Sequence, residues 1–201
     1  MATWDKLLKL AMCGVKIEVG ATAKQMFYDT PLTGEFNGSQ LDMTHCVTAD
    51  AMFATSRLTK VTGTSEWGLR HLIDADDMFG GCTNLTQIEG MGNWNMSNVV
   101  SMNQMFAECP SLKTLDMSHW DLSSLQSANL VFNNCGVQTL YINGKAYQRL
   151  MERYIGTPGL SLIDSQFSDN GIEIEDTKIY KITSPTSITG SQVEITVVGT
   201  L

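Results

Sequence analysis

Apolar residues in the middle of the chain return at a nearly constant interval. The interval is marked by a Met-Phe pair, which begins at Met26, Met52, Met78 and Met105, and a Val-Phe pair stands in the same place at Val131. The successive separations are 26, 26, 27 and 26 residues. A period of this size is typical of a solenoid, in which each coil buries its apolar side against its neighbours. The pattern predicts a stack of about five coils with a period of about 26 residues.

Further apolar columns come into register when the coils are aligned on the Met-Phe pair. Four columns precede the pair: Leu41, Trp67, Trp94 and Trp120; Met43, Leu69, Met96 and Leu122; Cys46, Leu72, Val99 and Leu125; and Ala49, Ala75, Met102 and Ala128. Behind the pair come a cysteine column, Cys82, Cys109 and Cys135, and two aliphatic columns, Leu58/Val61, Leu85/Ile88, Leu112/Leu115 and Val137/Leu140. Side chains of one size recur because each coil fills the same space between its neighbours.

Each coil contains a predicted strand. Residues 112–118 alternate between polar and apolar, with Leu115 and Met117 on the inward side, as expected for a strand with one buried face. A loop that carries the tryptophan column follows the strand.

The segment that ends in the Met-Phe pair is predicted to be a short helix. Within residues 97–106, Val99, Met102 and Phe106 stand at i, i+3 and i+7, which places them on one helical face. Three coils have a hydroxyl residue where it can cap such a helix: Thr44, Ser97 and Ser123. The predicted fold class is therefore an α/β solenoid, whose coils each run strand, loop, short helix and turn.

Different patterns at the two ends predict caps for the solenoid, which spans residues 23–142. Residues 1–22 predict an N-terminal cap that contains a helix at 3–12 and a strand at 15–19. Residues 143–157 predict a helical C-cap, which Gly156 and Pro158 end. The predicted inward side of this helix is Tyr147, Leu150, Met151 and Tyr154.

Residues 158–201 predict a small antiparallel β appendage. Strand-like runs occur at 160–167, 171–176, 178–182 and 191–201, with turn-forming residues between them. Such a sheet needs the solenoid or a neighbouring molecule to pack on. The last run is either an edge strand that docks in an assembly or a simple C-terminal cap.

The repeat resembles a known family at its best-preserved stretch. Residues 105–135 read MFAECPSLKTLDMSHWDLSSLQSANLVFNNC, and this pattern is similar to the BspA-type leucine-rich repeat of bacterial surface proteins and mycoplasma lipoproteins. The resemblance covers about residues 23–142. It implies a short, right-handed, leucine-rich-repeat-like stack. It also implies a non-catalytic adhesion or recognition protein at the cell surface.

Charge and hydropathy exclude two classes of partner. The formal net charge is −8 at pH 7, and the 13 Lys and Arg residues are scattered along the chain. Binding to nucleic acid or to an anionic membrane needs a basic stripe, which the sequence lacks. It also lacks an apolar run long enough to span a bilayer. We therefore expect no nucleic-acid partner and no membrane insertion.

The N-terminal stretch LLKLAMCG, residues 7–14, superficially resembles a lipoprotein signal that ends at Cys13. Lys9 interrupts its apolar part, and Met12 stands where such signals use a small residue. We expect no signal peptide in the chain. Localisation therefore stays open between a cell surface, by resemblance, and a virion.

The cysteine column is the first candidate for chemistry. Equivalent positions in adjacent coils lie about 5 Å apart, which permits a disulfide. Three cysteines in a row cannot all pair, however, and their spacing matches no zinc motif. We predict that Cys82, Cys109 and Cys135 are buried free thiols.

Histidines and acidic residues fill other polar columns. His45 and His71 share a column with Asn98 and Ser124, which favours a polar position over a catalytic or metal-binding one. The column Lys24, Asp50, Asp76, Asn103 and Asn129 mixes charges and lacks the alternating oxygen ligands of a calcium loop. We predict no catalytic residue, no metal site, no cofactor and hence no enzyme.

Two surfaces remain for binding. The tryptophan column could stack sugars, but its flanking inward residues favour core packing. The outward residues of the predicted strands line a polar strip that a partner can use: Lys60, Thr62, Gln87, Glu89, Thr114, Asp116, Thr139 and Tyr141. A merely solvated sheet explains this strip equally well, because a binding surface usually holds more Tyr, Trp or Arg.

Two functions follow from these observations. The first is a non-enzymatic adhesion or recognition module that binds a protein or a cell-surface glycan through the strand face. The alternative is a structural component of a phage virion or another large assembly, a decoration or fibre subunit. Such a subunit would dock on itself or on virion proteins through residues 160–201.

Overall fold

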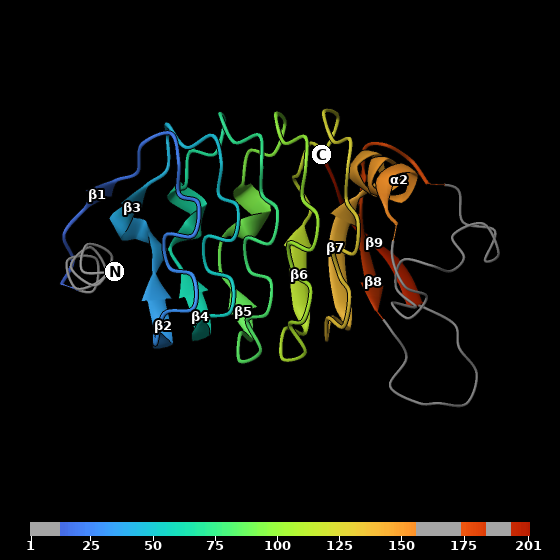
Figure 1. Ribbon diagram of the computed structural model, residues 1–201. Coiled ribbons are helices and arrows are strands. Elements are labelled where there is room, and N and C mark those ends of the chain that lie inside the picture. The colour runs from blue at the N-terminus through green and yellow to red at the C-terminus, as the bar shows by residue number, and fades with distance from the viewer. Residues whose placement is uncertain (1–12, 156–173, 184–193) are drawn as a thin grey trace.

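The computed structural model is a β-solenoid whose coils lie side by side along one axis (Figure 1). It describes residues 13–155, 174–183 and 194–201. The coils begin beside β1 (Ile17–Glu18) and β3 (Leu41–Asp42) and end at α2 (Gly144–Arg153). The predicted solenoid of about five coils is confirmed. The predicted helix at 3–12 and the predicted strand at 160–167 lie outside the described residues.

Parallel strands form one side of the solenoid, which we call the strand wall. It contains β2 (Thr33–Asn37), β4 (Arg57–Thr62), β5 (Gln87–Ile88), β6 (Thr114–Met117) and β7 (Thr139–Asn143). Strands β2, β4 and β5 pair in parallel in one sheet, and β6 pairs in parallel with β7 in another. The inward residues alternate as the sequence predicts: Leu115 and Met117 are fully buried, and Thr114 and Asp116 are exposed.

Short turns join the strands to the tryptophan column. In the first three coils these turns are the 3-10 helices η1 (Gly38–Gln40), η2 (Thr64–Glu66) and η3 (Met91–Asn93). Each indole Nε1 donates a hydrogen bond to the turn of the preceding coil: Trp67 to the carbonyl of Gly38, Trp94 to Thr64, and Trp120 to the carbonyl of Met91. The polar tips of the buried indoles are thereby satisfied.

The Met-Phe segments form a second side, which we call the turn wall: residues 22–30, 48–56, 74–82, 101–109 and 127–135. Four backbone N–H groups of each coil donate to four carbonyl oxygens of the next, at N–O distances between 2.7 and 3.0 Å. Between the third and fourth coils, for example, Phe79 N donates to Met105 O at 3.0 Å. The ladder repeats at all four junctions, so the turn wall joins the coils without a break.

The short helix predicted over residues 97–106 is wrong. The residue before each Met-Phe pair has a left-handed backbone, with φ between 51° and 55°, and Gln104 is one example. This conformation breaks a right-handed helix and turns two consecutive side chains inward, so that Met105 and Phe106 are both fully buried. Because the coils contain no such helix, the fold is a β-solenoid, and the α/β class is not supported.

The predicted helix caps have a different role. The backbone N–H groups of Thr44, Ser97 and Ser123 donate to the side-chain Oδ1 of the residue two positions earlier, at 2.9 to 3.2 Å. These acceptors are Asp42, Asn95 and Asp121. They form Asx turns, which start the segment that leads to the turn wall.

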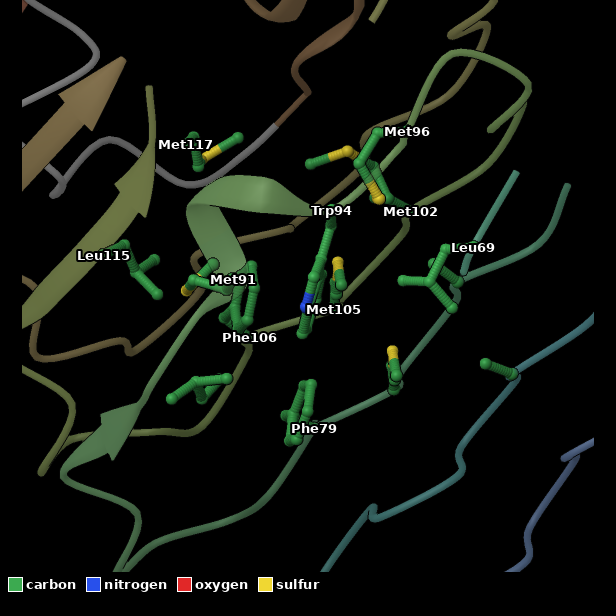
Figure 2. Packing of buried hydrophobic residues seen from close by; sticks show 14 of the residues in the cluster. Leu69, Phe79, Met91, Trp94, Met96, Met102, Met105, Phe106, Leu115 and Met117 are labelled. Atoms are coloured by element: carbon green, nitrogen blue, oxygen red, sulfur yellow. The ribbon is translucent and has the colours of Figure 1, made fainter. Parts of the chain in front are cut away.

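Aromatic side chains stack through the interior. Phe27, Phe53, Phe79, Phe106 and Phe132 form one column, with ring centroids 5.1 to 6.1 Å apart. A second column is formed by Trp67, Trp94 and Trp120, with ring centroids 5.5 and 5.8 Å apart. Figure 2 shows Trp94 beside Phe79, Phe106 and the neighbouring methionines. Core packing of the tryptophans is therefore confirmed over sugar stacking.

The C-terminal end combines a helix and a hairpin. Helix α2 lies within the predicted range, and Asn143 caps it by accepting a hydrogen bond from Ala146 N. The predicted inward side is confirmed, since Tyr147 and Leu150 are buried and Met151 and Tyr154 pack against the core. Strands β8 (Lys178–Thr183) and β9 (Glu194–Thr200) are antiparallel, and β8 pairs with β7. The appendage thus extends the strand wall.

Candidate functional site

The outer surface of the strand wall carries the candidate site. All eight residues predicted to line this face lie on it, in two groups. Lys60 and Thr62 on β4 lie beside Gln87 and Glu89 of the next coil, and Lys60 pairs with Gln87 in register. Thr114 and Asp116 on β6 pair with Thr139 and Tyr141 on β7.

Ion pairing dominates the first group. The Lys60 ammonium lies 2.6 Å from Glu89 Oε1, and this hydrogen bond raises the pKa of Lys60 above its ordinary value. Thr62 Oγ1 donates to Glu35 Oε1 at 3.1 Å. Lys60 and Thr62 in this part of the face are therefore already engaged by carboxylates on the same wall.

The second group continues onto the appendage. Tyr141 pairs in register with Lys181 on β8, and the Lys181 ammonium lies 6.0 Å from the centre of the Tyr141 ring. At this distance a cation attracts the face of an aromatic ring. The appendage therefore positions the only aromatic residue among the eight predicted face residues.

The two groups meet at a seam between β5 and β6, where no strand pairing joins the described residues of the two sheets. A groove of about 500 Å³ lies over this seam. We call it the seam groove. Its lining is Thr86, Gln87, Ile88, Glu89, Gly90, Lys113, Thr114 and Asp116. The structure thus brings together four of the eight predicted residues, Gln87, Glu89, Thr114 and Asp116, in one depression.

The seam coincides with a difference in backbone between the third and fourth coils. Gly90 follows β5 and has a left-handed φ of 87°. A Cβ at this position would lie 2.5 Å from Ser65 N. Gly63 has the same place and hand in the second coil, whereas Met117 fills it in the fourth. β6 continues to Met117, whereas β5 stops after Ile88, so the two strands end at different places.

Asp116 lies on β6 and lines the seam groove. Its Oδ1 accepts a hydrogen bond from Ser118 N at 3.0 Å. Its Oδ2 lies against Gly92 of the third coil: a Cβ added to Gly92 would be 2.5 Å from this oxygen. The glycine therefore leaves the space that the carboxylate uses. Alternation within single coils did not predict Thr86, Lys113, Gly90 or Gly92 at this site. The change from Gly63 and Gly90 to Met117 is the sequence feature that could have indicated the seam.

The cysteine column lies inside the solenoid and away from this face. Cys82 and Cys109 are buried free thiols, as predicted, whereas Cys135 is half-buried. The thiols of Cys82 and Cys109 donate to the carbonyls of Phe53 and Phe79 at 3.1 Å. Burial raises the pKa of both thiols, and it raises the pKa of Cys135 to about 11. This column therefore joins coils through hydrogen bonds.

The acidic column lies on the turn wall, where its side chains already bond to residues of neighbouring coils. Asp76 Oδ1 accepts from Asn103 N at 2.7 Å, and Asn103 Oδ1 accepts from Asn129 N at 2.8 Å. The Lys24 ammonium lies 2.6 Å from Asp50 Oδ2. In the part of the chain that the structure describes, no group of three or more His, Cys, Asp or Glu could hold a metal ion.

Two further findings concern the described residues. His45 and His71 are exposed, at equivalent positions of adjacent coils. No helix within residues 13–155, 174–183 and 194–201 has the length and apolar character needed to cross a bilayer.

Comparisons with known proteins match the repeat alone. A family profile described as Mycoplasma protein of unknown function, DUF285, matches residues 47–143, slightly less than half of the chain. The matched span runs from the second coil to the end of β7 and contains both sides of the seam. The search of curated proteins found no match. The search of solved structures also found none. The region of the chain that holds the candidate site is therefore similar to a mycoplasma repeat family.

Proposed function

We propose that the protein is a non-enzymatic recognition or adhesion module of the BspA-type leucine-rich repeat kind. It binds a protein or a glycan partner through the outer surface of the strand wall. The observation that carries the proposal is the seam groove, which gathers Gln87, Glu89, Thr114 and Asp116 in one depression.

The two walls contribute differently to the stacking of the coils, and this difference supports the proposal. The turn wall joins every pair of adjacent coils with four backbone hydrogen bonds. On the strand wall, Thr114 and Asp116 are exposed, and the surface ion pair between Lys60 and Glu89 adds little to the stacking. Residues that packing does not require are free to serve recognition, and repeat proteins commonly bind partners through such extended faces.

A binding screen with a matched pair of variants tests the proposal. The labelled protein is screened against immobilised glycans and immobilised extracellular proteins. The face variant combines Gln87→Ala, Thr114→Ala, Asp116→Ala and Tyr141→Ala. The control variant changes four exposed residues outside the strand wall: His45→Ala, Val47→Ala, His71→Ala and Ile73→Ala.

We expect the face variant to lose the strongest signals of the screen and the control variant to keep them. Signals that both variants keep, or that the control loses equally, would contradict the strand wall as the binding surface. Circular dichroism and urea unfolding of both variants confirm that each retains the fold, since surface substitutions usually change stability by less than about 0.5 kcal/mol.

A second function is favoured by one observation on the appendage. Strand β9 is the last strand of its sheet among the described residues, and it exposes apolar side chains: Val197 is 53% exposed and Val198 is 49% exposed. Exposed strand edges of this kind pair with other chains. We propose as the alternative that the protein is a structural component of a virion or another large assembly that docks through β9.

Light scattering of the full chain tests whether the protein assembles with itself through β9. The alternative expects a defined oligomer that Val197→Lys with Val198→Lys converts to a monomer, whereas Val15→Lys, at a valine that is 45% exposed, leaves the oligomer unchanged. A monomer for the unchanged chain at all concentrations would contradict self-assembly and leave a heterologous assembly partner as the only form of the alternative.

A further inference from the structure

We propose that the seam groove is a binding site for a neutral glycan segment, with Asp116, Gln87 and Thr114 as the groups that hold its hydroxyls. This inference rests on the proposed recognition function and names the ligand class for the same surface. It follows from the chemistry of the lining, the charge balance of the groove and the backbone of the seam.

The lining fits a polyhydroxylated ligand better than a protein side chain. It offers a carboxylate, an amide and hydroxyls at Asp116, Gln87 and Thr114, and none of the described residues that line it is a tryptophan, tyrosine or arginine. Protein interfaces draw most of their affinity from those three residue types in desolvated pockets. Sugar hydroxyls donate and accept at once, and they match carboxylate, amide and hydroxyl partners.

The charge balance favours a neutral ligand. Glu89 is paired with Lys60 at 2.6 Å, and the Lys113 ammonium donates to the carbonyl of Pro110 at 2.7 Å. Asp116 has no cation within salt-bridge distance among the described residues and accepts from Ser118 N alone. A free carboxylate repels an anionic sugar, and it forms strong, charge-assisted hydrogen bonds with neutral hydroxyls.

The backbone of the seam adds hydrogen-bonding capacity that a continuous sheet lacks. Because β5 and β6 do not pair, the groups that would join them are not used by the neighbouring strand. A ligand over the seam can therefore reach main-chain donors and acceptors as well as side chains. A groove of about 500 Å³ also falls within the usual size of small-molecule sites.

The central carboxylate is held in place before any ligand arrives. Its Oδ1 is fixed by Ser118 N, and its Oδ2 lies in the space left by Gly92. Tyr141 pairs in register with Asp116 and lies beside it on β7. A polar group that is already oriented loses less freedom on binding.

Nuclear magnetic resonance with defined sugars tests the inference on the full, ¹⁵N-labelled chain. The probes are neutral tetrasaccharides of glucose, mannose, galactose and N-acetylglucosamine, together with the anionic hyaluronan tetrasaccharide. We expect at least one neutral probe to give saturable shifts at the amides of residues 86–90 and 113–116, and the hyaluronan probe to bind more weakly.

Three variants sharpen the test. Asp116→Asn keeps the acceptor for Ser118 N but removes the charge, and it should weaken binding of the selected tetrasaccharide about tenfold. Gly92→Ala keeps the charge but fills the space under the carboxylate, and it should weaken binding as well. Asp121→Asn is the matched control, because Asp121 accepts from Ser123 N in the same way but does not line the groove. It should leave binding unchanged.

Several outcomes overturn the inference. These are the absence of saturable seam shifts with every neutral probe up to about 10 mM, tighter binding of the hyaluronan probe, and equal weakening by Asp121→Asn. The glycan assignment is also overturned if the binding screen finds a protein partner whose binding depends on the same seam residues. That result would support the recognition function. The proposed recognition function is contradicted by a different result, namely that no partner found in that screen depends on the strand wall.

Discussion

The turn wall and the strand wall are built from the same five coils, and they differ in continuity. On the turn wall, four backbone hydrogen bonds join each coil to the next at every junction. On the strand wall, pairing stops between β5 and β6 and resumes at β6 and β7. The stacking of the solenoid therefore depends chiefly on one wall, and the other can vary in strand length, turn type and surface chemistry.

The interior shows the same asymmetry. Behind the turn wall a phenylalanine repeats in every coil, preceded by a methionine in the first four coils and by Val131 in the fifth, and all of these side chains are buried. The strand wall carries the left-handed Gly63 and Gly90 in its second and third coils and Met117 on β6 in the fourth, and the seam groove lies between the third and fourth coils. A repeat protein can thus gain a site by interrupting one of its ladders while another holds the coils in register.

The largest effect is expected from a change in the turn-wall core. Phe106→Ala removes a fully buried ring that stacks on Phe79 and Phe132 at 6.1 Å each. We expect a loss of about 3–5 kcal/mol in the free energy of unfolding, because the cavity cannot collapse between two fixed coils. Urea unfolding measures it. Tyr28→Ala, at an exposed aromatic residue, is the control and should cost far less.

The second prediction separates the polar parts of the two walls. Asn103→Ala removes the acceptor of Asn129 N and the donor to Asp76, and it should cost about 1–3 kcal/mol, because partly buried groups lose their partners. Thr114→Ala, on the exposed strand wall, should stay within about 0.5 kcal/mol of the unchanged protein. Equal losses in urea unfolding would show that both walls hold the stack to the same degree.

Local patterns predicted the strand wall well because strand alternation reports burial directly. The alternation around Leu115 and Met117 needs no knowledge of the neighbouring coil. The Met-Phe segment misled the same reasoning, because apolar residues at i, i+3 and i+7 also arise when a left-handed residue turns two consecutive side chains inward. Gln104 and Ala51 are not glycines, so their identity gives no sign of that backbone.

Only part of the seam groove could be predicted from the sequence. The outward positions of Gln87, Glu89, Thr114 and Asp116 follow from alternation within each coil. Their gathering into one depression depends on which strands pair, and pairing depends on where each strand ends relative to its neighbour. β5 and β6 end at different places, so the groove could have been found only by comparing adjacent coils position by position.

The third prediction concerns the thiols behind the turn wall. Burial raises the pKa of Cys46 and Cys135 to about 11 and raises that of Cys109 as well. Thiols of the unfolded chain lose their protons near pH 8.5, so between about pH 8.5 and 11 the folded state binds more protons. Each such thiol then lowers the free energy of unfolding by about 1.4 kcal/mol per pH unit as the pH rises.

Urea unfolding at pH 8, 9 and 10 measures this slope, which Cys109→Ser should reduce by the share of one thiol. Serine keeps a donor for the Phe79 carbonyl, and Ser56 already occupies the equivalent place in the second coil. Cys13→Ser, at an exposed cysteine, should leave the slope unchanged. An unchanged slope in Cys109→Ser would mean that this thiol is not protected by burial.

The smallest effect should be a gain in stability, and it tests the backbone that distinguishes the turn wall from a helix. Gln104 is exposed and has a φ of 54°, a conformation that costs a residue with a Cβ about 1–2 kcal/mol and glycine almost none. Part of this gain is lost because glycine adds freedom to the unfolded chain. Gln104→Gly should therefore raise the free energy of unfolding by about 0.5–1 kcal/mol. Gln126→Gly, at an exposed residue of the same coil that is absent from the positive-φ set, should lower it. If both variants lose stability equally, the left-handed kink is not what brings Met105 and Phe106 together in the core.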